Sequence, residues 1–198
     1  MDDEVVKNVR FSKSDEYIYY WVEGDKGHSL RRQARYSANF TALFQHERAT
    51  GDLSIAPNGS MIAFSTVSLL PNNQKCIQIT GIHPVTHEQQ TLTNCQNAFS
   101  HSPGWLNNTT LLYIKETKDG SRSLWVMDMV NETHNKLAIP PVHVYAVIDN
   151  QLAVFNDDKL LMYQLNNTGL HATLVQSLSL TWKVNTEPKL SWLNNKRI

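Results

Sequence analysis

The sequence is short of several features that would identify whole classes of protein. Its 18 lysine and arginine residues are balanced by 18 aspartate and glutamate residues, so the formal net charge is zero. Nucleic acids and anionic membrane surfaces attract excess positive charge, and neither is an expected partner of this segment. No apolar run approaches the roughly 18 residues that cross a bilayer. The acidic residues Met1-Asp-Asp-Glu-Val do not resemble the positively charged beginning of a signal peptide. Any membrane contact is therefore expected through a segment outside this chain.

Helical periodicity is also missing, because no window keeps a helical pattern for the ten or more residues that a helix needs. Apolar and polar residues instead alternate in short runs that are separated by asparagine, aspartate, glycine and proline. The aromatic run Tyr17–Trp21, followed by the turn Gly24–Gly27, is typical of a strand, a turn and a second strand. The sequence therefore predicts an all-β protein of successive hairpins, and its 41% hydrophobic residues can form an ordinary core.

A repeat indicates how these hairpins are organised. An apolar anchor, a polar turn and an apolar strand recur from five positions, Phe11, Ile55, Trp105, Val147 and Trp192. The anchors are separated by 44, 50, 42 and 45 residues, close to the roughly 40 to 50 residues of a four-stranded antiparallel propeller blade. A single sheet cannot bury both of its faces, and stacking blades around an axis solves that problem. We therefore expect an incomplete β-propeller.

The repeat divides the chain into about four blades and the start of a fifth. We expect a single propeller fragment over residues 1–198, with blades at approximately 5–50, 51–97, 98–141 and 142–185, and the next one beginning at 186–198. An unclosed array leaves edge strands open to pairing. We therefore predict a larger propeller, completed either by further blades or by a second copy in a homodimer.

Two segments carry a family resemblance. Ala56-Pro-Asn-Gly-Ser-Met-Ile-Ala-Phe and Lys118-Asp-Gly-Ser-Arg-Ser-Leu-Trp-Val-Met-Asp-Met resemble the WD40-like repeats of the TolB type. Proteins with such repeats include the periplasmic TolB propeller, the propellers of prolyl-oligopeptidase and dipeptidyl-peptidase enzymes, oligogalacturonate lyases, and the periplasmic sensor domains of membrane-anchored transcription regulators similar to CadC and ToxR. The resemblance implies the fold much more firmly than the function.

Peptidase chemistry is not expected, because the chain has no Gly-x-Ser-x-Gly elbow. We expect a non-catalytic binding or sensing domain without a cofactor, which binds a protein or small-molecule signal. The resemblance suggests the periplasmic part of a transcription regulator that is tethered to the inner membrane. Two alternatives remain open: a substrate-holding propeller of a peptidase or polysaccharide-lyase type of enzyme, and a TolB-like scaffold for protein assembly.

The two cysteines are a candidate disulfide. A hairpin that turns at Val85 and Thr86 would place Cys76 directly opposite Cys95. Facing Cα atoms on adjacent strands lie about 4.5 to 5.5 Å apart, which a disulfide can span, and the closed loop would stabilise the fold by roughly 3 kcal/mol. This bond would indicate an oxidising compartment. The alternatives are two buried thiols in a cytosolic blade and a metal site, for which the spacing is unusual.

Four residues are possible ligand contacts. Tyr19 and Trp21 belong to an aromatic run that cannot face inward at every position, and Arg31 and Arg35 would share one face of a strand, with Arg32 on the other. Core packing for the aromatic residues and a solvated strand for the arginines are the competing interpretations.

No catalytic residue and no metal site is expected. His83 and His87 are four residues apart, a spacing that joins two side chains on a helix, but Pro84 indicates a turn. Asparagine in most of the six Asn-x-Ser/Thr sequons is attributed to turns, where its backbone tolerance is useful.

Overall fold

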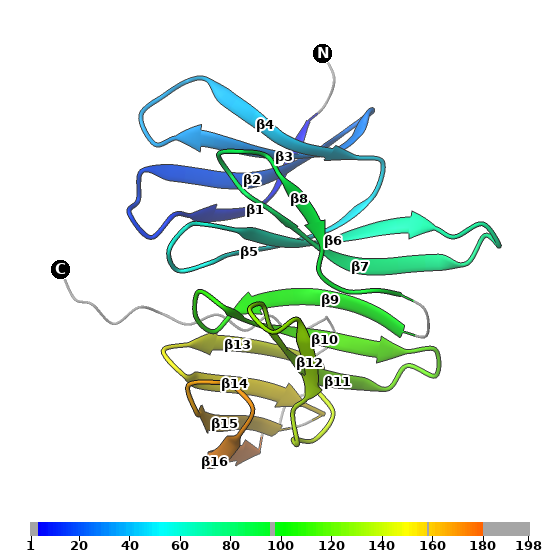
Figure 1. Ribbon diagram of the computed structural model, residues 1–198, viewed down its shortest axis with the longest axis vertical. Coiled ribbons are helices and arrows are strands. Elements are labelled where there is room, and N and C mark those ends of the chain that lie inside the picture. The colour runs from blue at the N-terminus through cyan, green and yellow to red at the C-terminus, as the bar shows by residue number, and fades with distance from the viewer. Residues whose placement is uncertain (1–3, 96–97, 158, 180–198) are drawn as a thin grey trace.

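The chain folds into four antiparallel sheets and has no helix among the described residues, which are 4–95, 98–157 and 159–179 of this computed structural model (Figure 1). The first two sheets contain β1 (Val5–Phe11), β2 (Tyr17–Gly24), β3 (Gly27–Ala34) and β4 (Phe40–His46), then β5 (Ala49–Ile55), β6 (Ile62–Leu69), β7 (Lys75–Ile82) and β8 (Gln89–Thr91). The other two contain β9 (Ala98–Trp105), β10 (Thr110–Thr117), β11 (Arg122–Asp128) and β12 (Thr133–Lys136), then β13 (Val144–Ile148), β14 (Gln151–Asn156), β15 (Lys159–Leu165) and β16 (Ala172–Ser179). No stretch of the described chain forms a helix that could span a membrane.

Each sheet is a simple meander in which sequence neighbours pair as antiparallel hairpins. The sheets span residues 5–46, 49–91, 98–136 and 144–179, and we refer to them as blades 1 to 4. The first strands, β1, β5, β9 and β13, are inner strands that lie next to one another in chain order. The expected start of a further blade at 186–198, with its anchor Trp192, lies outside the described residues.

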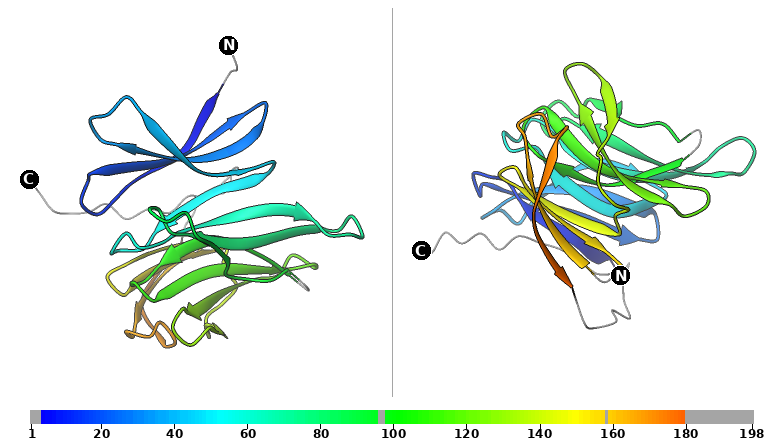
Figure 2. Two further views of the ribbon diagram at one scale, coloured as in Figure 1. Left: turned by 45° about the horizontal axis from the view of Figure 1, so that its top comes forward. Right: turned by 90° about the horizontal axis from the view of Figure 1, so that it is seen from below.

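The blades stack face to face, as the repeat predicts (Figures 1 and 2). Three separate apolar clusters fill the interfaces between successive blades, because the alternation of each strand gives every blade an apolar face on both sides. The interfaces hold, for example, Trp21 and Phe64 between blades 1 and 2, Ile79 and Trp105 between blades 2 and 3, and Leu124 and Val154 between blades 3 and 4. The protein is therefore an all-β, propeller-like array of four-stranded blades.

Exposed apolar side chains gather on the two outermost blades. They include Val5, Val6, Val9, Phe11 and Phe40 on blade 1, and Leu170, Leu174, Val175 and Leu178 on or beside β16 of blade 4. Each of these blades has one neighbour within the described chain, whereas blades 2 and 3 have two. This arrangement agrees with an unclosed array, and its completion by further blades or a second copy stays a prediction.

The asparagines of the sequons in two blade turns are explained by hydrogen bonding and not by backbone tolerance. The Oδ1 of Asn58 accepts from the backbone N–H of Ser60 at 3.0 Å and from its hydroxyl at 2.7 Å. Asn107 accepts in the same way from Thr109, at 2.9 and 3.1 Å. Neither asparagine has a positive φ. Backbone tolerance was therefore the wrong explanation for these two asparagines. Each one stabilises an Asx turn together with the hydroxyl two residues later.

Candidate functional site

A cavity of about 670 Å³ lies where the four inner strands converge. Every residue that lines it is either an anchor of the sequence repeat or one of the three residues before an anchor. The cavity therefore runs along the inner strands of the unclosed array, and we refer to it as the channel. Pockets of this size, with polar groups from several elements, are typical of small-ligand sites.

The channel has an irregular wall because three of the inner strands contain bulges. Strand pairing shifts between Lys7 and Val9 in β1, between Ala49 and Leu53 in β5, and opposite Leu112 and Ile114 in β9. A bulge leaves a residue outside the hydrogen-bond ladder and turns its side chain in a new direction. The equivalent positions, three residues before each anchor, hold Asn8, Asp52 and Ser102, and all three line the channel. Asn8 and Ser102 adopt positive φ values of 51° and 54°.

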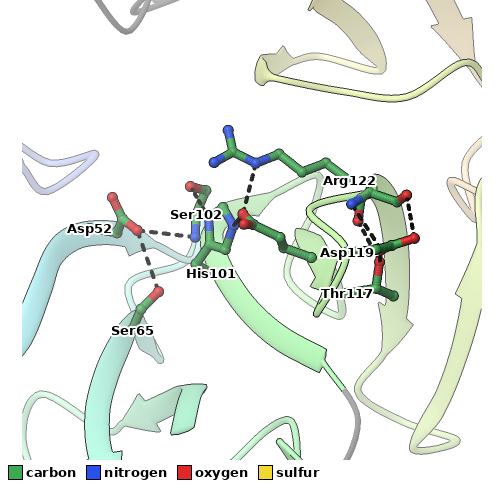
Figure 3. Close-up of polar contacts among 9 residues, drawn as sticks. Asp52, Ser65, His101, Ser102, Thr117, Asp119 and Arg122 are labelled. Carbon is green, nitrogen blue, oxygen red and sulfur yellow. Dashed lines mark hydrogen bonds and ion pairs between the residues drawn. The ribbon is translucent and has the colours of Figure 1, made fainter. Parts of the chain in front are cut away.

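Asp52 connects three blades at this point. Its Oδ2 accepts a hydrogen bond from the backbone N–H of Ser102 in blade 3 at 3.1 Å and from the Ser65 hydroxyl in its own blade at 3.4 Å (Figure 3). Its backbone carbonyl accepts from the indole Nε1 of Trp21 in blade 1 at 3.3 Å. The bulge thus exposes a carbonyl and a carboxylate that neighbouring blades use as acceptors.

A second polar network continues from Ser102 into blade 3. The Nδ1 of His101 lies 2.9 Å from the Ser102 hydroxyl, and its Nε2 lies 3.4 Å from Oε2 of Glu116. Glu116 is also paired with the Nε of Arg122 at 2.7 Å. Burial lowers the pKa of His101, Arg122 lowers it further, and the carboxylates of Asp52 and Glu116 oppose this shift. The imidazole is therefore neutral at pH 7.

Tyr145 of β13 joins blade 4 to the same bulge. Its hydroxyl lies 2.7 Å from the carbonyl oxygen of Ser102 and 2.8 Å from that of Leu112, and it donates to this pair. Burial, with a smaller contribution from Asp52, raises the pKa of Tyr145 well above 10, so the hydroxyl keeps its proton. All four blades are consequently linked around the channel by hydrogen bonds at the bulges.

The aromatic residues predicted as ligand contacts are core residues instead. Tyr19 is 4% exposed and Trp21 is 1% exposed, and both pack in the interface between blades 1 and 2. Their interpretation as exposed contacts is therefore corrected, because blade stacking covers the strand face on which they lie. The residue between them, Tyr20, is half-buried on the other face and donates to Oε1 of Gln33 at 3.1 Å.

The predicted arginines do not form one patch and do not line the channel. Arg31 makes a two-pronged ion pair with Glu4, at 2.6 and 2.8 Å, and its guanidinium lies 4.2 Å from the centre of the Phe40 ring. Arg32 points to the opposite face, as predicted, and donates to the Pro84 carbonyl of blade 2 at 2.7 Å. Arg35 is exposed, but β3 ends at Ala34, so strand alternation does not place it beside Arg31.

Cys76 and Cys95 form the predicted disulfide, with their Cα atoms 5.5 Å apart. The hairpin has the expected register, since Ile82 pairs with Gln89 and Thr80 pairs with Thr91. Cys95 lies beyond the end of β8, where side-chain and backbone hydrogen bonds to Ile79 continue the alignment. The bond fastens β7 to the segment that leads into the inner strand β9.

His83 supports the turn of this hairpin. Its Nδ1 accepts from the backbone N–H groups of Val85 and Thr86, at 3.2 and 3.1 Å. His87 adopts a positive φ of 62° in the same turn. Within the described ranges, no group of three or more histidine, cysteine, aspartate and glutamate side chains could hold a metal ion.

The channel residues were missed by the sequence-based selection, although a signal for them exists. Of the anchors themselves, Trp105 is buried and Phe11 is exposed. The positions three residues before them are polar in three repeats, at Asn8, Asp52 and Ser102. Polar residues at one register position of an otherwise apolar inner strand indicate a shared polar environment.

Solved structures of other proteins share this arrangement. The chain is similar to an oligogalacturonate lyase in complex with manganese (13% identity, TM-score 0.65), covering 86% of this chain and 52% of the lyase. It is also similar to a chain of a nidogen/laminin complex (11%, 0.64), covering 89% and 66%. The β-propeller domain of the Trilobed protease from Pyrococcus furiosus, which has an open velcro topology, gives 13% identity and a TM-score of 0.54, covering 91% and 58%.

These similarities establish the β-propeller fold and nothing further, because identities this low do not carry function. The chain spans between about half and two thirds of the length of these three structures. No protein-family model and no curated protein sequence matches it.

Proposed function

We propose that this β-propeller domain is a non-catalytic binding and sensing module whose ligand occupies the channel. The observation that carries the proposal is the convergence of polar residues from three inner strands on one cavity of about 670 Å³. The bulges in β5 and β9 are held by hydrogen bonds between blades, so this part of the site is preorganised. A rigid site of this kind loses little conformational entropy when it binds.

The channel suits a small polar molecule, or a peptide segment of a partner protein, that presents hydrogen-bond acceptors. Arg10 lines the channel, is exposed, and forms no ion pair with any described residue. Its guanidinium can bind a carboxylate or carbonyl group through two parallel hydrogen bonds. The hydroxyl of Ser54, which also lines the channel, adds a further donor.

A hydrolytic role is disfavoured by the electrostatics around Ser102. Contacts link Ser102 to His101 and His101 to Glu116, as in a catalytic triad of nucleophile, base and carboxylate. However, the carboxylate of Asp52 accepts the Ser102 backbone N–H at 3.1 Å. A negative charge beside the hydroxyl would oppose the oxyanion that forms during acyl transfer, whereas hydrolases place donors there.

The disulfide supports an extracytoplasmic location, because such bonds persist in oxidising compartments. Together with the resemblance of the repeats to TolB-type sensors, it supports the periplasmic, signal-sensing part of a membrane-anchored transcription regulator. The full reading frame tests this role directly. A winged-helix segment and a transmembrane helix upstream would support it, and a hydrolase domain downstream would contradict it.

Ligand binding can be tested by thermal-shift screening with amino acids, short peptides and oligosaccharides. A channel ligand is expected to raise the melting temperature of the wild type, and Arg10→Gln should reduce this rise. Lys13→Gln, an exposed substitution outside the channel, is the matched control. A hit unaffected by Arg10→Gln would contradict the channel as its site. Mass spectrometry of the recovered compound would contradict the non-catalytic role if the compound were converted.

A further inference from the structure

A second pocket, of about 400 Å³, lies between blades 1 and 2, outside the channel. Its apolar side is formed by Trp21, Ala49 and Val67. Its polar side carries four nitrogen-bearing side chains from separate segments, Lys7, His28, Arg48 and Lys75, and a single carboxylate, Glu23. This is a concentration of positive charge in a chain whose formal net charge is zero.

Only part of this charge is compensated within the pocket. Lys7 forms an ion pair with Glu23. The hydrogen bond and the charge of Lys7 hold the pKa of Glu23 below its ordinary value, so this carboxylate is ionised at neutral pH. Neither Arg48 nor Lys75 has a carboxylate within ion-pair distance in the described part of the chain. Two full positive charges therefore remain at the pocket.

The other acidic residues of this region line a different pocket. Asp25 and Glu47 line a neighbouring pocket, which shares Glu23 and His28 with the first one. They lie on the side of the β2–β3 turn, whereas Arg48, Ala49 and Lys75 line only the cationic pocket. A ligand in the cationic pocket would thus meet both cationic donors and apolar residues.

We propose that this pocket is a second binding site, which takes a small molecule bearing a carboxylate or phosphate group. Arg48, between β4 and β5, has a planar guanidinium whose donors match such oxyanions. Lys75, at the start of β7, adds a second positive charge. Val67, which is only partly buried, can contact the carbon skeleton of the ligand. The site goes beyond the proposed channel function and does not depend on it.

Trp21 provides a built-in reporter for this site. Its indole Nε1–H donates to the Asp52 carbonyl at 3.3 Å, and its ring lines the pocket. An anion bound beside the ring should therefore shift the Trp21 indole resonance in a ¹⁵N–¹H spectrum. The shift should saturate with the anion, unlike a general effect of ionic strength.

The test is a titration of the isotope-labelled chain with inorganic phosphate and, separately, with succinate, against sodium chloride at matched ionic strength. A saturable shift of the Trp21 indole with phosphate, succinate or both supports the site and identifies the preferred oxyanion. Arg48→Gln and Lys75→Gln are each expected to weaken binding by about tenfold. Lys118→Gln, an exposed lysine in the β10–β11 turn, should leave it unchanged.

Three outcomes would overturn the proposal: no saturable shift with either anion, an equal response to chloride, or undiminished binding in both pocket variants. The dispersion of the remaining resonances checks that each variant is folded. If either variant is not folded, Lys75→Glu is used in its place, because position 75 is exposed. Unchanged affinity in Lys75→Glu would count against the site.

Discussion

The hydroxyl of Tyr145 covers Gly104 so closely that a Cβ at position 104 would lie 2.8 Å from the hydroxyl oxygen. These two residues belong to the inner strands of adjacent blades, β13 and β9. The hydroxyl cannot easily move away, because it donates to the carbonyls of Ser102 and Leu112. A glycine is therefore required here by packing, since its φ is not positive.

Gly104→Ala should lower the free energy of unfolding by about 1–3 kcal/mol, because the methyl group must displace a hydrogen-bonded side chain. Urea denaturation measures the loss. Gly24→Ala is the control, since a Cβ there would meet only Cγ of Glu4, at the ordinary distance of 3.7 Å. Equal stability of the two variants would contradict the tight contact.

Tyr145→Phe should cost about 1–3 kcal/mol, because it removes the one hydroxyl proton that the carbonyls of Ser102 and Leu112 share. Tyr20→Phe, which removes a half-buried hydroxyl from Gln33, should cost less. The double variant Gly104→Ala/Tyr145→Phe should lose less than the sum of the single losses, because removing the hydroxyl relieves the closest contact. Simple additivity would show that the two residues do not interact.

Reduction of the Cys76–Cys95 bond should destabilise the chain by about 3 kcal/mol, since it frees a loop with a sequence separation of 19 residues. Denaturation with and without a reductant gives this difference. The variant Cys76→Ser/Cys95→Ser should have the same stability as the reduced wild type, and the reductant should not change it. An unchanged unfolding midpoint on reduction would argue against a stabilising bond.

His101 should make stability depend on pH in the acid range. Burial holds its folded-state pKa below the ordinary value of 6.5, so the unfolded chain binds the proton more readily. Its contribution is complete above pH 6.5 and is lost as the pH falls through the lower, folded-state pKa. His101→Gln should remove this contribution, and an unchanged acid limb of the stability profile would contradict the assignment.

The neighbours of His101 should move its pKa in opposite directions. Asp52→Asn removes a charge that raises this pKa, so the pKa should fall further. Arg122→Gln removes a positive charge that lowers the pKa of His101. It also frees Glu116 to interact with the imidazole, so both effects should raise this pKa. Proton NMR of the histidine ring measures both shifts, and movement in the same direction would refute the network.

Contacts between residues that are close together in the chain could be predicted from the sequence. Turn residues and strand alternation define each hairpin, and the hairpin centred on Val85 and Thr86 fixes the pairing that brings Cys76 to Cys95. The spacing of the anchors likewise determines that each blade has four strands. These features depend on segments of fewer than about 50 residues, within which chain connectivity restricts the possible partners.

Only the tertiary structure decided which residues are buried and which line the channel. Alternation gives each strand two faces but does not say which face a neighbouring blade covers, so Tyr19 and Trp21 were misplaced. Likewise, Asn8, Asp52 and Ser102 come together only because three bulged strands from different blades converge on one axis. That convergence follows from blade stacking, which acts between residues far apart in the sequence. The recurring polar position marks these residues in the repeats, but it does not show that they face one common cavity.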